Sequence, residues 1–114
     1  MPNPVVHFEV LGKDTEATQS FYANIFDWPM EKVMDSYAMV KPGGENGIPG
    51  GVGSTMGDTP GHSTFYVEVD DLQATLDAIE AAGGSTAQPP MDVPNGPSIA
   101  LFRDPDGNLV GLVK

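Results

Sequence analysis

The order of predicted elements along this chain repeats, and this repeat constrains the fold more than any other feature. Apolar, β-branched runs at residues 5–11 and 63–69 each predict a strand, and each is followed by an aspartate, a helical pattern and three shorter strands. Phe65 lies 57 residues after Phe8, and the same offset matches further identical residues. The identical pairs are Phe8 with Phe65, Val10 with Val67, Asp14 with Asp71, Ala17 with Ala74, and Thr18 with Thr75. We therefore expect two tandem βαβββ modules at approximately residues 1–58 and 59–114.

The first module has a helix that Asp14 caps and Pro29 ends. Four apolar residues recur in it at helical spacing, which predicts one buried stripe. They are Ala17, Phe21, Ile25 and Trp28. Three modest strands should follow at residues 31–34, 37–41 and 51–54, because Gly-rich and Pro-rich segments separate these short apolar runs.

The second module repeats this order. Asp70 and Asp71 open a helix with Leu72, Leu76 and Ile79 on one face, and glycines 83–84 end it. Strands are expected at residues 85–88, 98–102 and 109–113, and residues 104–107 form a tight turn between the last two. Together the two modules predict an α+β fold.

Composition narrows the class of protein. A chain of 114 residues is a common size for one domain, so we expect a single domain over residues 1–114. The absence of cysteine excludes disulfides, thiolate metal sites and thiol nucleophiles. A net charge of -11 with only five Lys and Arg argues against nucleic-acid binding and against binding to anionic membranes.

The sequence also indicates where the protein is located in the cell. The N-terminus does not resemble a signal peptide, because it lacks a basic segment followed by a long apolar one. No stretch reaches the roughly 18 apolar residues of a membrane span. We therefore expect a cytoplasmic protein.

Residues 7–10, 20–28, 66–72, 80–84 and 102–108 together resemble the vicinal oxygen chelate superfamily, to which glyoxalases, bleomycin-resistance proteins and extradiol dioxygenases belong. The resemblance spans almost the whole chain. It implies that the two modules form a half-open mixed β-barrel with flanking helices around a ligand cavity, usually in a homodimer. It also implies a divalent metal, such as Zn, Ni, Fe or Mn, bound near the first and last strands of each module.

The metal positions that the resemblance implies hold few usable ligands in this chain. His7 stands at the first position, but Thr64 stands at its equivalent in the second module. Gly111 and the pair Gly50–Gly51 stand where the family places its acidic ligands on the last strands. Because a catalytic metal needs about three protein ligands, we expect no resident cofactor.

Other residues suggest that a cavity is retained. Glu9 shares a strand face with His7, so the two could form a polar pair, although a strand-end glutamate is often merely solvated. Aromatic side chains at Trp28, Tyr37, Tyr66 and Phe102 offer stacking area, although core packing would explain them equally well. Glycines at 50, 51 and 111 should widen the cavity for a bulkier guest. We expect these residues, with Thr64, to bind a ligand.

Three functions remain open. In the leading hypothesis the protein binds a small organic molecule without a metal, either sequestering it or modifying it with His7 as the catalytic residue. In the second, a lyase, isomerase or dioxygenase holds a metal through His7 with His62, Glu9 or a partner chain. In the third, the fold is a non-catalytic scaffold or regulatory module.

Overall fold

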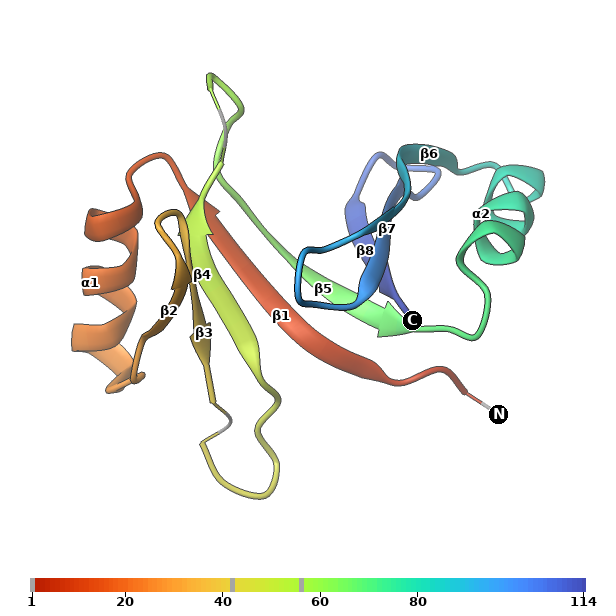
Figure 1. The fold of residues 1–114 in the computed structure, drawn as a ribbon. Coiled ribbons are helices and arrows are strands. Elements are labelled where there is room, and N and C mark those ends of the chain that lie inside the picture. The colour runs from red at the N-terminus through yellow and green to blue at the C-terminus, as the bar shows by residue number, and fades with distance from the viewer. Residues whose placement is uncertain (1, 42, 56) are drawn as a thin grey trace. The chain divides into compact units, whose positions relative to one another are not determined.

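Figure 1 shows the fold in a computed structural model that describes residues 2–41, 43–55 and 57–114. Contacts divide the chain into two compact units. The first unit holds His7–Ser63, and the second holds residues 2–6 together with Thr64–Lys114. The division lies close to the expected border between the modules, except that the start of the chain belongs to the second unit. A single domain over residues 1–114 stays a prediction.

The first unit is built from one βαβββ module. Strand β1 (Val5–Gly12), which enters the unit at His7, leads into helix α1 (Thr15–Phe26). Strands β2 (Glu31–Met34), β3 (Tyr37–Val40) and β4 (Gly50–Ser54) follow. β1 pairs in parallel with β4, β4 pairs antiparallel with β3, and β3 pairs antiparallel with β2. The sheet order in this unit is therefore β2-β3-β4-β1.

The second module repeats this topology. Strand β5 (His62–Glu68) leads into helix α2 (Leu72–Ala81), and strands β6 (Ser85–Asp92), β7 (Ser98–Arg103) and β8 (Leu109–Val113) follow. β5 pairs in parallel with β8, which pairs antiparallel with β7, and β7 pairs antiparallel with β6. In both modules the first strand thus pairs with the last. The predicted α+β class with two tandem βαβββ modules is confirmed.

The repeat extends to the starts of the two helices. The Asp14 carboxylate accepts a hydrogen bond of 2.9 Å from the backbone N–H of Ala17, and Asp71 accepts one of the same length from Ala74. Each aspartate therefore satisfies a helix N–H that has no partner within the helix. Among the described residues, no helix is long and apolar enough to cross a membrane.

Helix α2 packs as the sequence predicts. Leu72 and Leu76 are buried, and the partly buried Ile79 packs against them. The same cluster contains Val69, Ala100 and Leu112. The apolar stripe of this helix therefore lies in the core of the second unit.

The buried stripe predicted for α1 is wrong. Ala17 is exposed, and Phe21 and Ile25 are 58% and 59% exposed. The least exposed residue of the helix is instead Gln19, whose side-chain amide donates a 3.0 Å hydrogen bond to the backbone carbonyl of Val52 on β4. Apolar spacing missed this side of the helix because its central residue is a polar side chain that is buried with its hydrogen bond satisfied.

Strand β6 is longer than predicted. It continues through Pro89 and Pro90 to Asp92, whereas the sequence predicts its end at Gln88. The pairing with β7 shifts between Gln88 and Met91, so neither proline stands at a paired position. A residue without an N–H is tolerated here because β6 is an edge strand in its unit.

Candidate functional site

Strand β1 has two different faces within the first unit. Phe8 and Val10 point to one face, and His7 and Glu9 point to the other, because side chains alternate along a strand. The Phe8 ring lies 5.1 Å from the Trp28 ring, which in turn stacks at 5.7 Å on Tyr22 of α1. Helix α1 therefore covers the Phe8 face. We call the opposite face of β1, β4 and β3, which carries His7 and Glu9, the helix-free face of the first unit.

Three polar side chains meet on the helix-free face. The hydroxyl oxygen of Tyr37 lies 2.9 Å from Nε2 of His7, and the hydroxyl donates a 3.0 Å hydrogen bond to Oε2 of Glu9. All three side chains are partly buried. We call them the Tyr37 cluster. The strand alternation correctly placed His7 beside Glu9, but only the structure shows that Tyr37 joins them.

The Tyr37 hydroxyl is the central group of the cluster. It donates to the Glu9 carboxylate, and its oxygen lies within hydrogen-bond distance of Nε2 of His7. Which of Tyr37 and His7 donates in the second contact depends on the tautomer of the imidazole. A hydroxyl has a single proton, so its donation to Glu9 favours the tautomer of His7 that carries its proton on Nε2.

Burial also sets the charge of His7. Desolvation by burial lowers the pKa of the His7 imidazole from its usual value, because the charged form loses hydration. At neutral pH the ring is therefore uncharged. A neutral imidazole with a protonated Nε2 has its basic lone pair on Nδ1.

The residues of the Tyr37 cluster do not fit a catalytic metal. In the part of the chain that the structure describes, no group of three or more His, Cys, Asp or Glu side chains could hold a metal ion. His7 and Glu9 are two such side chains, and Nε2 of His7 already lies within hydrogen-bond distance of the Tyr37 oxygen. Since a catalytic metal needs about three protein ligands, no step of the chemistry is assigned to one.

The glycines predicted to widen the cavity lie under aromatic rings instead. A Cβ atom added at Gly51 would overlap the hydroxyl and Cζ of Tyr37. One added at Gly50 would overlap the ring of Phe8 on the opposite face. The prediction of a wider cavity at these positions is therefore wrong. It failed because sequence alone does not show which ring lies across a neighbouring strand.

Residues predicted from the second module lie in the second unit. The Thr64 hydroxyl donates a 2.7 Å hydrogen bond to the carbonyl of Leu109. Tyr66 is buried and pairs with Gly111, whose added Cβ would overlap the Tyr66 ring, so this glycine does not widen a cavity either. Phe102 is partly buried and packs against the core of the second unit, and its part in ligand binding stays a prediction.

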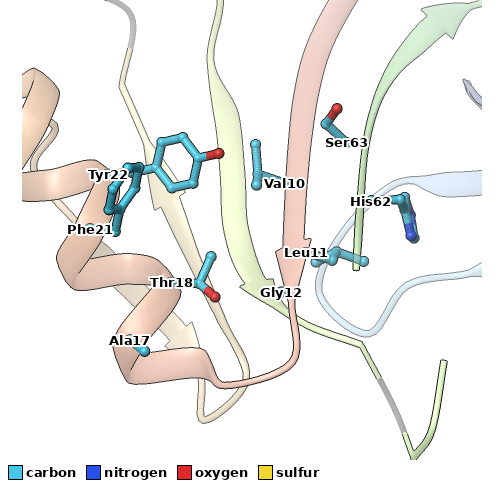
Figure 2. Close-up of a pocket in the computed structure, with 9 residues that line it drawn as sticks. All are labelled: Val10, Leu11, Gly12, Ala17, Thr18, Phe21, Tyr22, His62 and Ser63. Atoms are coloured by element: carbon cyan, nitrogen blue, oxygen red, sulfur yellow. The ribbon is translucent and has the colours of Figure 1, made fainter. Parts of the chain in front are cut away.

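A groove that the sequence did not predict lies on the α1 side of the first unit. Its volume is about 510 Å³. Thr18 and Tyr22 project from α1 toward Val10 on β1 (Figure 2). The remaining lining residues are Leu11, Gly12, Ala17, Phe21, His62 and Ser63. Trp28, predicted as a ligand-binding residue, packs on Phe8 and Tyr22 on this same side, so the structure does not bring it to the Tyr37 cluster.

Comparisons with known sequences point to one family. The sequence profile described as the Glyoxalase/Bleomycin resistance protein/Dioxygenase superfamily matches residues 5–112. The CFP32 protein of Mycobacterium tuberculosis, whose name provisionally assigns it to the glyoxylases, is 30% identical over 107 residues, which is 87% of this chain and 41% of that protein. The anthracycline biosynthesis protein DnrV of Streptomyces peucetius is 28% identical in an alignment of 125 positions that covers 93% of this chain and 45% of that protein. The chain thus spans less than half the length of these two curated relatives.

A solved structure has the same fold. A variant of methylmalonyl-CoA epimerase from Streptomyces coelicolor, in complex with 2-nitronate-propionyl-CoA, superimposes with a TM-score of 0.73 at 16% sequence identity. The match covers 99% of this chain and 94% of that one. At this identity the likeness establishes the fold and leaves the ligand and the reaction open.

Proposed function

Because this chain belongs to the Glyoxalase/Bleomycin resistance protein/Dioxygenase superfamily, we propose that it binds a small organic molecule at the Tyr37 cluster without a divalent metal. The observation that carries the proposal is the hydroxyl of Tyr37, which links His7 and Glu9 on the helix-free face. The partly buried cluster concentrates an acid, a phenol and a neutral imidazole on one sheet face. Convergent polar groups of this kind orient a ligand.

The chemistry of the cluster favours a polar ligand with hydrogen-bonding groups. The Glu9 carboxylate accepts from hydroxyl or amine groups and attracts a cationic one. The neutral His7 ring can form hydrogen bonds with a ligand without adding a second charge to the site. An anionic group would face the Glu9 carboxylate directly, so a neutral or cationic head is preferred.

His7 is the residue that would do chemistry, if the bound molecule reacts. Its ring can take up a proton, and the resulting positive charge would be stabilised by the neighbouring Tyr37 hydroxyl and by the Glu9 carboxylate beyond it. An imidazole backed by a carboxylate is a recurrent arrangement for moving protons. Sequestration and proton transfer are thus two uses of the same cluster.

The relatives support a small organic ligand. The solved epimerase was captured with a coenzyme A compound, and the name of the Streptomyces relative assigns it to the biosynthesis of an anthracycline. Both names refer to organic compounds. We extend to this chain only the class of ligand, a small organic molecule, and neither of the two compounds.

The proposal is tested by a thermal-shift screen with a broad set of metabolites and antibiotics, performed both with and without excess chelator. A ligand that binds the native state raises the melting temperature by mass action. We expect at least one compound to stabilise the wild-type protein and to leave the His7→Ala variant unchanged. Stabilisation that chelator removes would favour the metal-dependent lyase, isomerase or dioxygenase. No stabilisation by any compound would favour a scaffold or regulatory module.

We also propose that the partner of the chain is a second copy of itself. Several large apolar side chains of the first unit are more than half exposed, and two of them, Phe21 and Ile25, lie one helical turn apart on α1. They are Phe21, Ile25 and Phe26 of α1 and Val33 of β2. A symmetric interface would bury them, and a homodimer is the commonest such assembly.

A cytoplasmic location likewise stays a prediction.

The dimer gives a prediction for Phe21, which is 58% exposed. Replacing it by glutamate places a charge in the proposed interface, so Phe21→Glu should convert a dimer into a monomer at micromolar concentration, as measured by analytical ultracentrifugation. Met91→Glu is the control, because Met91 is 43% exposed and lies in the second unit. A wild-type chain that sediments as a monomer at high concentration would contradict the proposal.

A further inference from the structure

We propose that Gly51 and Tyr37 are positioning residues: the missing side chain at Gly51 makes room for the Tyr37 hydroxyl, which holds the His7 proton on Nε2. The inference deepens the proposed function and rests on it for the importance of the cluster in binding. The part of the inference that concerns the positions of Gly51, Tyr37 and the His7 proton does not depend on any ligand. The sequence identified each residue as a possible wall of a cavity, and the structure assigns them a joint task instead.

The sheet register shows how far the Tyr37 side chain must reach. Tyr37 on β3 pairs with Gly53 on β4, whereas Glu9 on β1 pairs with Gly51. The hydroxyl therefore reaches diagonally across β4, from the level of Gly53 to the level of Gly51. Two residues along a strand are about 6.6 Å, close to the length of a tyrosine side chain.

The Tyr37 ring passes over two of the three glycines of β4, Gly51 and Gly53. A Cβ at Gly53 would lie 3.0 Å from Cδ1 of the ring, and a Cβ at Gly51 would overlap the hydroxyl oxygen and Cζ. Even the methyl group of alanine at position 51 therefore occupies the place of the hydroxyl. The overlap is relieved when the Tyr37 side chain moves, and that movement takes the hydroxyl away from its place between His7 and Glu9.

Backbone conformation does not explain the glycine at position 51. The glycines with a positive φ in the described part of the chain are Gly44, Gly57, Gly83 and Gly107. Gly51 lies outside that set, in a regular strand where glycine is a poor strand former. The absence of a side chain at this position is therefore explained by the space that the Tyr37 ring needs.

The space has a chemical consequence for His7. With the hydroxyl in place, Tyr37 donates to Glu9 and lies within hydrogen-bond distance of Nε2 of His7, where in the proposed tautomer it accepts from the Nε2–H. Without it this bond is lost, and the preference of the imidazole proton for Nε2 is weakened. Gly51 thereby acts on His7 through Tyr37, without touching the imidazole itself.

The experiment observes the imidazole N–H proton of His7 by NMR in ¹⁵N-labelled protein. In the wild type we expect a slowly exchanging proton on Nε2 with a nuclear Overhauser contact to the Tyr37 ring. Tyr37→Phe and Gly51→Ala should both lose this signal. The chain has two histidines, so a His62→Gln variant assigns the resonances.

Gly50→Ala is the matched control. Gly50 neighbours Gly51 on the same strand and also lies outside the positive-φ glycines, but its added Cβ would overlap Phe8 on the α1 side. This variant imposes a similar steric cost on the opposite face. It should therefore lose stability and keep the His7 signal.

Two results would overturn the inference. One is a wild-type His7 with its proton on Nδ1. The other is a folded Gly51→Ala protein that keeps the protected Nε2 proton. If Gly51→Ala does not fold, Tyr37→Phe decides, because this variant keeps the ring and loses only the hydroxyl; a retained signal overturns the inference. A failed ligand screen with the predicted proton pattern would instead overturn the proposed function alone.

Discussion

Leu76→Ala is expected to lower the free energy of unfolding by about 2–5 kcal/mol, the cost of removing a large aliphatic side chain from a packed core. Leu76 is 1% exposed and belongs to the cluster formed by α2, β7 and β8. Truncation leaves a cavity beside Val69, Leu72 and Leu112. Leu72 is held in α2 and Leu112 in β8, so these two cannot readily collapse into it. Chemical denaturation in urea measures the change.

Ile25→Ala on the other helix is the comparison for this effect. Its position satisfies the helical apolar pattern as well as Leu76 does, but the side chain is 59% exposed. The substitution should therefore change stability by no more than about 0.5 kcal/mol. Equal losses from the two substitutions would contradict the orientation that the structure gives to α1, unless a second copy of the chain buries Ile25. Measurement at a concentration where the chain is monomeric separates these two explanations.

Tyr37→Phe is expected to weaken binding of the ligand found in the screen by about tenfold or more. The substitution removes a hydrogen bond to the Glu9 carboxylate, and bonds to charged groups contribute about 1.5–3 kcal/mol. It also removes the acceptor for the His7 proton, so the three-residue cluster is no longer preorganised. Isothermal titration calorimetry with the identified compound measures the loss.

Tyr22→Phe is the matched control for Tyr37→Phe. It makes the same chemical change in the same unit, but Tyr22 lines the groove on the α1 side (Figure 2). Affinity should stay close to that of the wild type. The reverse outcome, in which Tyr22→Phe loses binding and Tyr37→Phe keeps it, would place the ligand in the groove and contradict the assignment of the site to the helix-free face.

The sequence predicted the repeat because its signals are local. Each module opens with an apolar strand, an aspartate cap and a helix, and local patterns define these elements without knowledge of distant contacts. The equal hydrogen bonds of Asp14 and Asp71 show that the repeat extends to single atoms. The face shared by His7 and Glu9 also follows from strand alternation alone.

The remaining features depend on contacts between elements. The buried side of α1 is centred on Gln19, whose amide bonds to a carbonyl of β4, and no apolar pattern identifies such a residue. The role of Tyr37 depends on the register that sets it level with Gly53, two residues from Gly51. A glycine in a strand predicts open space or a close approach equally well, and only the neighbouring ring decides between them.

Metal content and ligand binding, measured together, test the central claim most directly. The protein is purified without a histidine tag, analysed by inductively coupled plasma mass spectrometry, and titrated with the screened compound before and after prolonged chelation. Metal-independent binding at the Tyr37 cluster predicts far less than one divalent ion per chain and the same affinity in both titrations. One tightly bound divalent ion per chain, with binding that disappears on chelation and returns when the metal is restored, would contradict it.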